Sequence, residues 1–190
     1  MKKHMESKVD MSVESPRKII EENAHNISKE TISFIRYVEN QAYPEEMKMM
    51  QEDEDVEDIS ETYDVPIQQM IVVRGMDWYI IYSENHRYIE IVDIASLPTR
   101  DKDKSRREIH DYLIGVINKK AHDSNKAVIL SAKEDTSYKM IQRMVRNHEY
   151  EIITDIADTW DYDSAIIMHD LVLNPLKTHV EIDQSSSGKK

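Results

Sequence analysis

Near the middle of the chain stands the stretch Ile91-Val92-Asp93-Ile94-Ala95-Ser96-Leu97-Pro98-Thr99-Arg100. Its first half belongs to a run from Arg87 to Ala95 that is rich in β-branched residues, which indicates a strand. The charged residues after it include Ser105-Arg106-Arg107-Glu108, the pattern of a capping box at a helix start. The stretch therefore predicts a strand that leads through a polar loop into a helix.

Further strands are predicted on both sides of this stretch. Ile67 to Arg74 and Asp77 to Ser83 are β-branched and aromatic runs separated by the turn Gly75-Met76, so with the central run they should form an antiparallel meander. The apolar run from Lys126 to Ala132 reads as a buried strand. Two more strands are expected over Glu149 to Ile156 and Ser164 to Leu173.

Helical spacing marks the segments between the strands. Apolar residues on one face follow the capping box, and a second helix is expected after Asp135 or Thr136. Ser15-Pro16 has the residues of a helix start, and apolar residues from Ile20 to Ala42 then predict one long helix or two abutting ones. The order of elements predicts an α/β fold, a mixed and mostly antiparallel twisted sheet of about six strands with helices on both faces.

The ends of the chain and one internal segment lack such patterns. We expect flexible tails over residues 1–14 and 176–190, and a single domain over residues 15–175. Within that domain, residues 45–64 are strongly acidic, with Glu52-Asp53-Glu54-Asp55 at their centre, which predicts a solvated loop or helix insertion.

Composition limits the classes of function. The chain has 190 residues, no cysteine and a net charge of −12, and no apolar run long enough to span a bilayer. We therefore expect an acidic, cytoplasmic protein without a membrane partner. Nucleic acid is disfavoured as a partner because phosphate binding needs clustered Lys and Arg, whereas an amine-bearing small molecule or a basic protein fits the charge. No two histidines have the spacing of a helical zinc site, and no metal site is predicted.

Taken in order, these segments resemble the GNAT (Gcn5-related N-acetyltransferase) superfamily over roughly residues 17–173. The stretch from Ile91 to Arg100 looks like the central strand of that family, with its hydrophobic-x-Pro-x-Arg ending. Asn125 to Leu130 is placed like the next strand, and His148-Glu149-Tyr150 stands where the family usually has a Gly-Phe pair. The resemblance implies an acyl-CoA-dependent N-acyltransferase that uses acetyl-CoA and an amine acceptor.

The resemblance also implies where acetyl-CoA would bind. Main-chain groups of Ile94, Ala95, Ser96 and Leu97 would hold its pantetheine arm. Its pyrophosphate would lie against the loop and helix start, with contacts from Arg100, Lys102, Lys104, Ser105 and Arg106. The family has glycine at the two positions that are Asp103 and Ser105 here, and a carboxylate at Asp103 would repel pyrophosphate.

Candidate catalytic residues lie on the central strand and in the late helix. Glu90 and Asp93 could take a proton from the amine, and strand alternation places Asp93 on an apolar face with Ile89, Ile91 and Ala95. The family's late-helix tyrosine falls on Val145 here, and Tyr138 is a possible substitute. Because of these substitutions, a catalytically inactive GNAT-fold binding or structural protein in a larger assembly stays open as the alternative.

Overall fold

The computed structural model describes residues 18–42, 44, 65–98, 102–134, 137–161 and 166–176. The predicted tails lie almost wholly outside these residues, and the acidic segment 45–64 lies entirely outside them. The predicted domain boundary therefore stays a prediction. No helix within the described ranges is long and apolar enough to cross a membrane.

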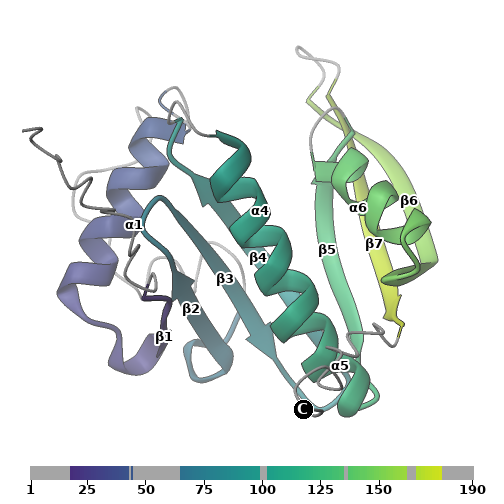
Figure 1. Ribbon diagram of the computed structural model, residues 1–190, viewed down its shortest axis with the longest axis horizontal. Helices are drawn as coiled ribbons and strands as arrows, with labels where there is room; N and C mark the ends of the chain where they lie inside the picture. The colour runs from purple at the N-terminus through teal and green to yellow at the C-terminus, as the bar shows by residue number, and fades with distance from the viewer. Residues whose placement is uncertain are drawn as a thin grey trace, which may run out of the picture.

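A seven-stranded sheet forms the centre of the molecule, in the order β1-β2-β3-β4-β5-β7-β6 (Figure 1). All neighbouring strands are antiparallel except β4 and β5, which are parallel. The strands are β1 (Ile20–Asn23), β2 (Met70–Arg74), β3 (Trp78–Glu84), β4 (Tyr88–Ser96), β5 (Ala127–Lys133), β6 (Tyr150–Asp161) and β7 (Ile166–Pro175). The mixed, mostly antiparallel sheet confirms the predicted fold class.

Helices cover both faces of this sheet. On one face lie α4 (Lys102–Tyr112), which continues through a π-helical segment (Leu113–Asn118) into α5 (Lys119–Asp123), and α6 (Ser137–Arg146). In Figure 1, α4 and α6 lie in front of the sheet. On the other face lies α1 (Lys29–Ala42). Short 3-10 turns, Ala24–Asn26 and Ile67–Gln69, precede α1 and β2.

Two apolar clusters hold these layers together. The larger one joins α4, the π-helical segment and α6 to the sheet, and contains the fully buried Trp78, Ile80 and Met144. The smaller one joins α1 to β2, β3 and the end of β4, through residues such as Ile35 and Tyr79. Burial of apolar side chains on two faces of one sheet is the main force that fixes this three-layer arrangement.

The start of the described chain differs from the prediction. Ile20–Asn23 forms strand β1 beside β2, instead of the first turns of a helix. The helix α1 begins only after Ser28, whose hydroxyl oxygen accepts a hydrogen bond from the Thr31 amide (3.2 Å). A serine that caps the amides of the first turn is a common way to begin a helix. Pairing with β2 therefore overrides the helical spacing of residues 20–27.

Two helices end in the same way, with a residue in the left-handed region. Asn125 has φ of 52° after α5, and His148 has φ of 60° after α6. At α6, the His148 amide donates to the Val145 carbonyl (3.0 Å) and the Glu149 amide to the Met144 carbonyl (2.9 Å). This pair of hydrogen bonds is the Schellman motif, which normally places glycine at the left-handed position. His148 thus occupies a backbone position that favours glycine.

Candidate functional site

The parallel strands β4 and β5 separate along their length. Their pairing runs only from Tyr88 with Ala127 to Ile91 with Leu130, although β4 continues to Ser96 and β5 to Lys133. In Figure 1 both strands run upwards and diverge. We call this divergence, between Val92–Ser96 and residues 131–133, the strand fork. The carboxyl ends of parallel strands at such a switch in strand order are a common place for ligands in α/β proteins.

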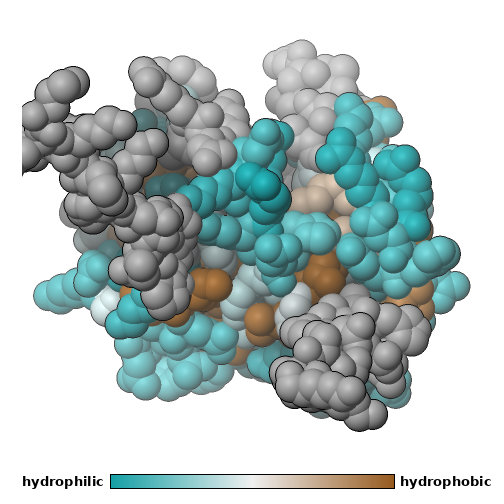
Figure 2. All heavy atoms as spheres, viewed as in Figure 1, coloured by the Kyte–Doolittle hydropathy of each residue, from teal (hydrophilic) through white to brown (hydrophobic). Residues whose placement is uncertain are grey.

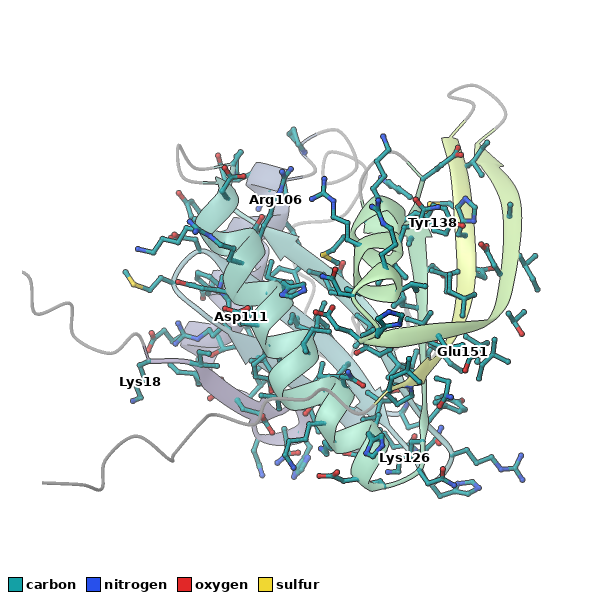
Figure 3. All side chains as sticks on the ribbon, turned by 45° about the vertical axis from the view of Figure 1, so that its right-hand side comes forward. Lys18, Arg106, Asp111, Lys126, Tyr138 and Glu151 are labelled. Atoms are coloured by element: carbon teal, nitrogen blue, oxygen red, sulfur yellow. The ribbon has the colours of Figure 1, made fainter. Side chains whose placement is uncertain are left out.

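The amino-terminal end of α4 lies just beyond β4. The helix begins at Lys102, and Figure 3 shows Arg106 near the same end. Unpaired backbone amides and the helix dipole make a helix start attractive to anions. The start of α4 therefore follows the carboxyl end of β4, on the side where β4 and β5 have separated.

The predicted anion-binding residues have different environments. Asp103 lies in the first turn of α4 and is exposed, as is Arg106, whereas Lys104 is half-buried. Ser105 is buried where α4 packs on the sheet, with 2% of its surface exposed. Arg100 lies outside the described residues, and the structure does not describe the side chain of Lys102.

The predicted capping box is wrong. Because α4 begins at Lys102, Ser105 lies inside the helix and cannot cap its start. The carboxylate of Glu108 instead accepts a hydrogen bond from the indole N–H of Trp78 (2.8 Å). The helix start thus depends on residues before Ser105, and Glu108 links α4 to the buried end of β3.

A β-bulge in β4 determines which way the candidate acids face. Tyr82 pairs with Ile91 and Ile81 pairs with Asp93, so Val92 is an extra residue in β4. A bulge reverses the alternation of side chains beyond it. The prediction that Asp93 shares a face with Ile89 and Ile91 is therefore wrong, whereas Ala95, which lies beyond the bulge, does share the face of Asp93.

The bulge places both candidate acids on the α1 side of the sheet. Ile91 belongs to the cluster under α4 and α6, so its neighbour Glu90 faces away from these helices. Asp93 pairs with Ile81, which belongs to the cluster under α1. In a regular strand Glu90 and Asp93 would lie on opposite faces of the sheet. Because of the bulge at Val92, both lie on the same face.

Asp93 is tied to a buried tyrosine. The Tyr79 hydroxyl lies 2.5 Å from the Asp93 Oδ2 and 3.3 Å from the Glu39 Oε1 of α1, close enough to donate to either carboxylate. Tyr79 is completely buried. The hydrogen bond holds Asp93 in place beside α1, which suits a structural or positioning role.

Glu90 is in a different situation. It lies one residue before the last pair of β4 and β5, between Ser83 of β3 and Ile129 of β5. Burial raises the pKa of the Glu90 carboxyl. Within the described residues its carboxylate makes no hydrogen bond or ion pair. A half-buried carboxylate with a raised pKa at the closed end of the fork has the properties of a general base.

The four residues predicted to hold pantetheine lie along the fork on β4 and just after it. Ile94 packs against the cluster under α4 and α6, and Ala95 is buried in the cluster under α1. Ser96 pairs with Trp78 at the end of β4. The Leu97 amide already donates to the Asp77 carbonyl (2.7 Å), so it is not free to donate to a ligand.

Tyr138 does not point towards the strand fork. Its hydroxyl donates to Asp155 of β6 (2.6 Å), and its ring stacks on His169 of β7 at 3.6 Å between centroids. Figure 3 shows Tyr138 on the first turn of α6, beside these strands. The Asp155 carboxylate also lies 2.6 Å from Nδ1 of His169. The late-helix Tyr138 is therefore engaged on the β6 side, and Val145 has no ionisable group.

Sequence reasoning missed this Tyr138–Asp155–His169 group. The three residues come from α6, β6 and β7, and only the pairing of β6 with β7 brings them together. No spacing along the chain signals such a contact. Among the residues that the structure describes, no group of three or more His, Asp or Glu could hold a metal ion.

The sequence matches no protein-family model and no curated protein, but the structure is similar to solved acetyltransferases. The ribosomal-protein-S18-alanine N-acetyltransferase of Escherichia coli matches with a TM-score of 0.55 at 9% identity, over 87% of this chain and 98% of that one. A Desulfovibrio desulfuricans protein assigned to the GNAT family has a TM-score of 0.52 at 10% identity, over 82% and 98%.

A third structure was solved with its cofactor. YncA of Salmonella typhimurium, in complex with acetyl-CoA, matches with a TM-score of 0.52 at 11% identity, over 90% of this chain and 99% of that one. These similarities span nearly the whole of each neighbour. Because the sequence identities are so low, the similarities establish the fold alone. In structure this chain resembles the GNAT acetyltransferases, and it has the GNAT fold.

Proposed function

We propose that the chain is an acyl-CoA-dependent N-acyltransferase, which transfers an acetyl group from acetyl-CoA to an amine. The observation that carries this proposal is the strand fork with the start of α4 beyond it. When bound, acetyl-CoA supplies an acyl group activated as a thioester. The neighbours in fold include acetyltransferases, one of them solved with acetyl-CoA.

The residues around the fork fit such a ligand, with one exception. Buried Ser105 is small and lets α4 pack closely on the sheet, as the glycine or alanine of the family would. Lys104 and Arg106 add positive charge near the helix start. Asp103 is the exception, although its exposure allows its carboxylate to turn into solvent.

Glu90 is the proposed general base. Its carboxylate is half-buried, has no partner within the described residues, and lies at the closed end of the fork. It would take a proton from the amine, while Asp93, hydrogen-bonded to Tyr79, would hold the adjoining part of β4 in place. No tyrosine of α6 would protonate the leaving sulfur, because Tyr138 donates to Asp155, so that proton would come from water as the C–S bond breaks and the C–N bond forms.

The alternative is a GNAT-fold protein without catalysis that binds other proteins. The carboxylate of Asp103 in the first turn of α4 favours it, because a negative charge near the pyrophosphate weakens cofactor binding. In that case the surface charge of the protein would select a basic partner.

A substitution that removes the charge of Asp103 distinguishes the acyltransferase from the non-catalytic binding protein. We expect Asp103→Asn to tighten acetyl-CoA binding about fivefold. The substitution removes the repulsion between the Asp103 carboxylate and a pyrophosphate bound a few ångströms away, which water partly screens. Asp111→Asn is the matched control, since Asp111 is also exposed on α4 but lies more than two turns further on. Equal affinities for Asp103→Asn, Asp111→Asn and the parent chain would remove the helix start as the anion site.

A further inference from the structure

The sheet ends in two edge strands of very different length. β1 forms one edge with four residues, whereas β6 forms the other with 12 residues and is the outermost strand on the right of Figure 1. Within the described residues β6 pairs only with β7, so the backbone N–H and C=O groups on its far side meet no other strand there. We call this side of β6 the outer edge. A row of such groups is a template for an added strand.

The outer edge lacks most of the devices that protect edge strands. Natural edges are often blunted by lysine, by proline or by β-bulges. The strand Tyr150–Asp161 contains no lysine, arginine or proline, and its two bulges, at Ile153 and Trp160, lie towards its ends. Residues 154–159 between the bulges pair regularly with β7. The middle of the outer edge is therefore regular enough to pair with another strand.

Hydrogen bonds to neighbouring elements hold the middle of β6 in place. The Asp155 carboxylate accepts a hydrogen bond from the Tyr138 hydroxyl (2.6 Å) and lies 2.6 Å from Nδ1 of His169. Tyr138 belongs to α6 and His169 to β7, so one residue of β6 is tied to both. A strand that is already fixed loses little conformational freedom when a partner pairs with it, which favours binding.

Two exposed isoleucines add apolar surface to β6. Ile153 is 60% exposed and Ile156 58%, and few large apolar side chains in the described part of the chain are exposed to this degree. Figure 2 shows hydrophobic residues among hydrophilic ones on the right-hand side of the molecule, where β6 lies. Side chains of an added strand would pack beside them, because directly opposite residues of paired strands lie about 5 Å apart.

The charge of β6 and β7 determines which partner fits. The sequences of the two strands contain no lysine or arginine, and their acidic residues are Glu151, Asp155, Asp158, Asp161 and Asp170. The cations of α6 belong to the helix layer in front of the sheet (Figure 1), outside the plane in which a strand adds. Pairing of two β6 strands would bring acidic sequences together, which disfavours a second copy of this chain. A strand that carries lysine or arginine beside apolar residues complements the outer edge.

We propose that the outer edge of β6 binds a protein partner by strand addition, and that the partner's strand alternates basic and apolar residues. Its main chain would pair with residues 154–159, and its apolar side chains would lie beside Ile156. β5 and β7 separate β6 from β4, so the outer edge is distinct from the strand fork. The inference therefore goes beyond the proposed acyl transfer and does not depend on it.

Three capped peptides of about eight residues, within the usual range of strand lengths, test the inference on the full chain. The first alternates valine and lysine, and the second has glutamate in place of lysine. The third has the side chains of the first but is N-methylated at every residue, so its backbone cannot donate hydrogen bonds. Binding is measured by NMR titration and by hydrogen exchange of the β6 amides, with the β1 amides at the other edge as the internal control.

We expect the valine–lysine peptide to bind at least about tenfold more tightly than either of the other two. The glutamate peptide would place like charges in cross-strand pairs, and the N-methylated peptide would lose the backbone hydrogen bonds of strand addition. The valine–lysine peptide should also slow hydrogen exchange of β6 amides and leave that of β1 amides unchanged.

A substitution on the outer edge tests the location. Ile156→Lys introduces the residue that natural edges use against strand addition, and should weaken the valine–lysine peptide at least about tenfold. Met76→Lys is the matched control, because Met76 is 62% exposed in the turn between β2 and β3, far from β6 in the order of strands. Met76→Lys should leave the affinity for the peptide unchanged.

The other outcomes would overturn the proposal. Equal binding of the N-methylated peptide would show attraction by charge alone, and equal binding of the glutamate peptide would exclude a basic partner. Absence of binding by all three peptides, or equal weakening by Ile156→Lys and Met76→Lys, would remove the outer edge as the site. A dimer seen by light scattering that Ile156→Lys dissolves would make the outer edge an interface between copies of this chain instead.

Discussion

His148, just after the end of α6, has a backbone conformation that is unfavourable for a residue with a side chain. The residue has φ of 60° and closes the Schellman motif through its amide and that of Glu149. A left-handed conformation costs an L-residue roughly 1–2 kcal/mol. Glycine removes this strain and in turn loses about 0.5–1 kcal/mol through its freer unfolded chain. Because the His148 side chain is exposed, its removal loses no buried contact.

The expected result for His148→Gly is a net gain in the free energy of unfolding of about 0.5–1 kcal/mol. For a chain of this length that gain raises Tm by about 1–4 °C. Differential scanning calorimetry and urea titration measure the two quantities independently. His148 belongs neither to the strand fork nor to the start of α4, so acetyl-CoA binding should not change.

Asn125→Gly is the matched control for His148→Gly. Asn125 occupies the same position of the same motif after α5, with φ of 52°. The short polar side chain of asparagine can hydrogen-bond locally in the left-handed region, so replacing it should gain less than replacing histidine. A fall in Tm for His148→Gly, or an equal gain for Asn125→Gly, would refute the assignment of strain to His148.

Three further predictions concern β3, the proposed base and β6. Gly75→Ala should destabilise the protein by about 2 kcal/mol in urea titrations, because the Cβ of the new alanine would lie 2.4 Å from Nε1 of the buried Trp78. Unchanged stability of this variant would show that the indole ring can move freely. Glu90→Gln should lower kcat at least about 100-fold with the acetyl-CoA Kd unchanged. Since burial raises the pKa of Glu90 above the ordinary 4.5, kcat of the parent chain should fall as pH drops through that raised pKa, and a rate without this limb would exclude Glu90. Asp155→Asn should cost about 1 kcal/mol at pH 7 through weakened hydrogen bonds to Tyr138 and His169. The hydrogen bond from Tyr138, and to a lesser degree that from His169, lower the pKa of the Asp155 carboxyl below its ordinary 3.8. The Asp155 carboxylate therefore stabilises the fold above pH 3.8, and this stabilisation is lost as pH falls through the lowered pKa. If the parent chain were still more stable than Asp155→Asn at about pH 2, this explanation would be contradicted.

The sequence predicted most of the strands because their signal is local. β-Branched and aromatic residues are frequent in Trp78–Glu84 and Tyr88–Ser96, and Gly75 marks the turn before the first of these strands. The amphipathic face of α6 is equally clear, with Ile141 and Met144 buried. Patterns of this kind depend on the residue order alone, which is why the mixed sheet and its helices could be predicted.

Features that depend on strand pairing could not be predicted. β1 is a strand only because Ile20–Asn23 finds an edge on β2. The face of Asp93 depends on one extra residue at Val92, and the fork appears only when β4 and β5 are paired. Tyr138, Asp155 and His169 meet through the pairing of β6 with β7. Alternation along a single strand carries no information about such registers.

The proposed function depends on an acyl-CoA site formed by the strand fork and the start of α4. Calorimetric titration of the full chain with acetyl-CoA tests it most directly. We expect saturable binding of one molecule per chain with Kd below about 1 mM, equivalent to more than about 4 kcal/mol, and tighter binding by the Asp103→Asn variant. No heat and no rise in Tm at millimolar acetyl-CoA would contradict it, and would leave the chain a GNAT-fold protein with another role.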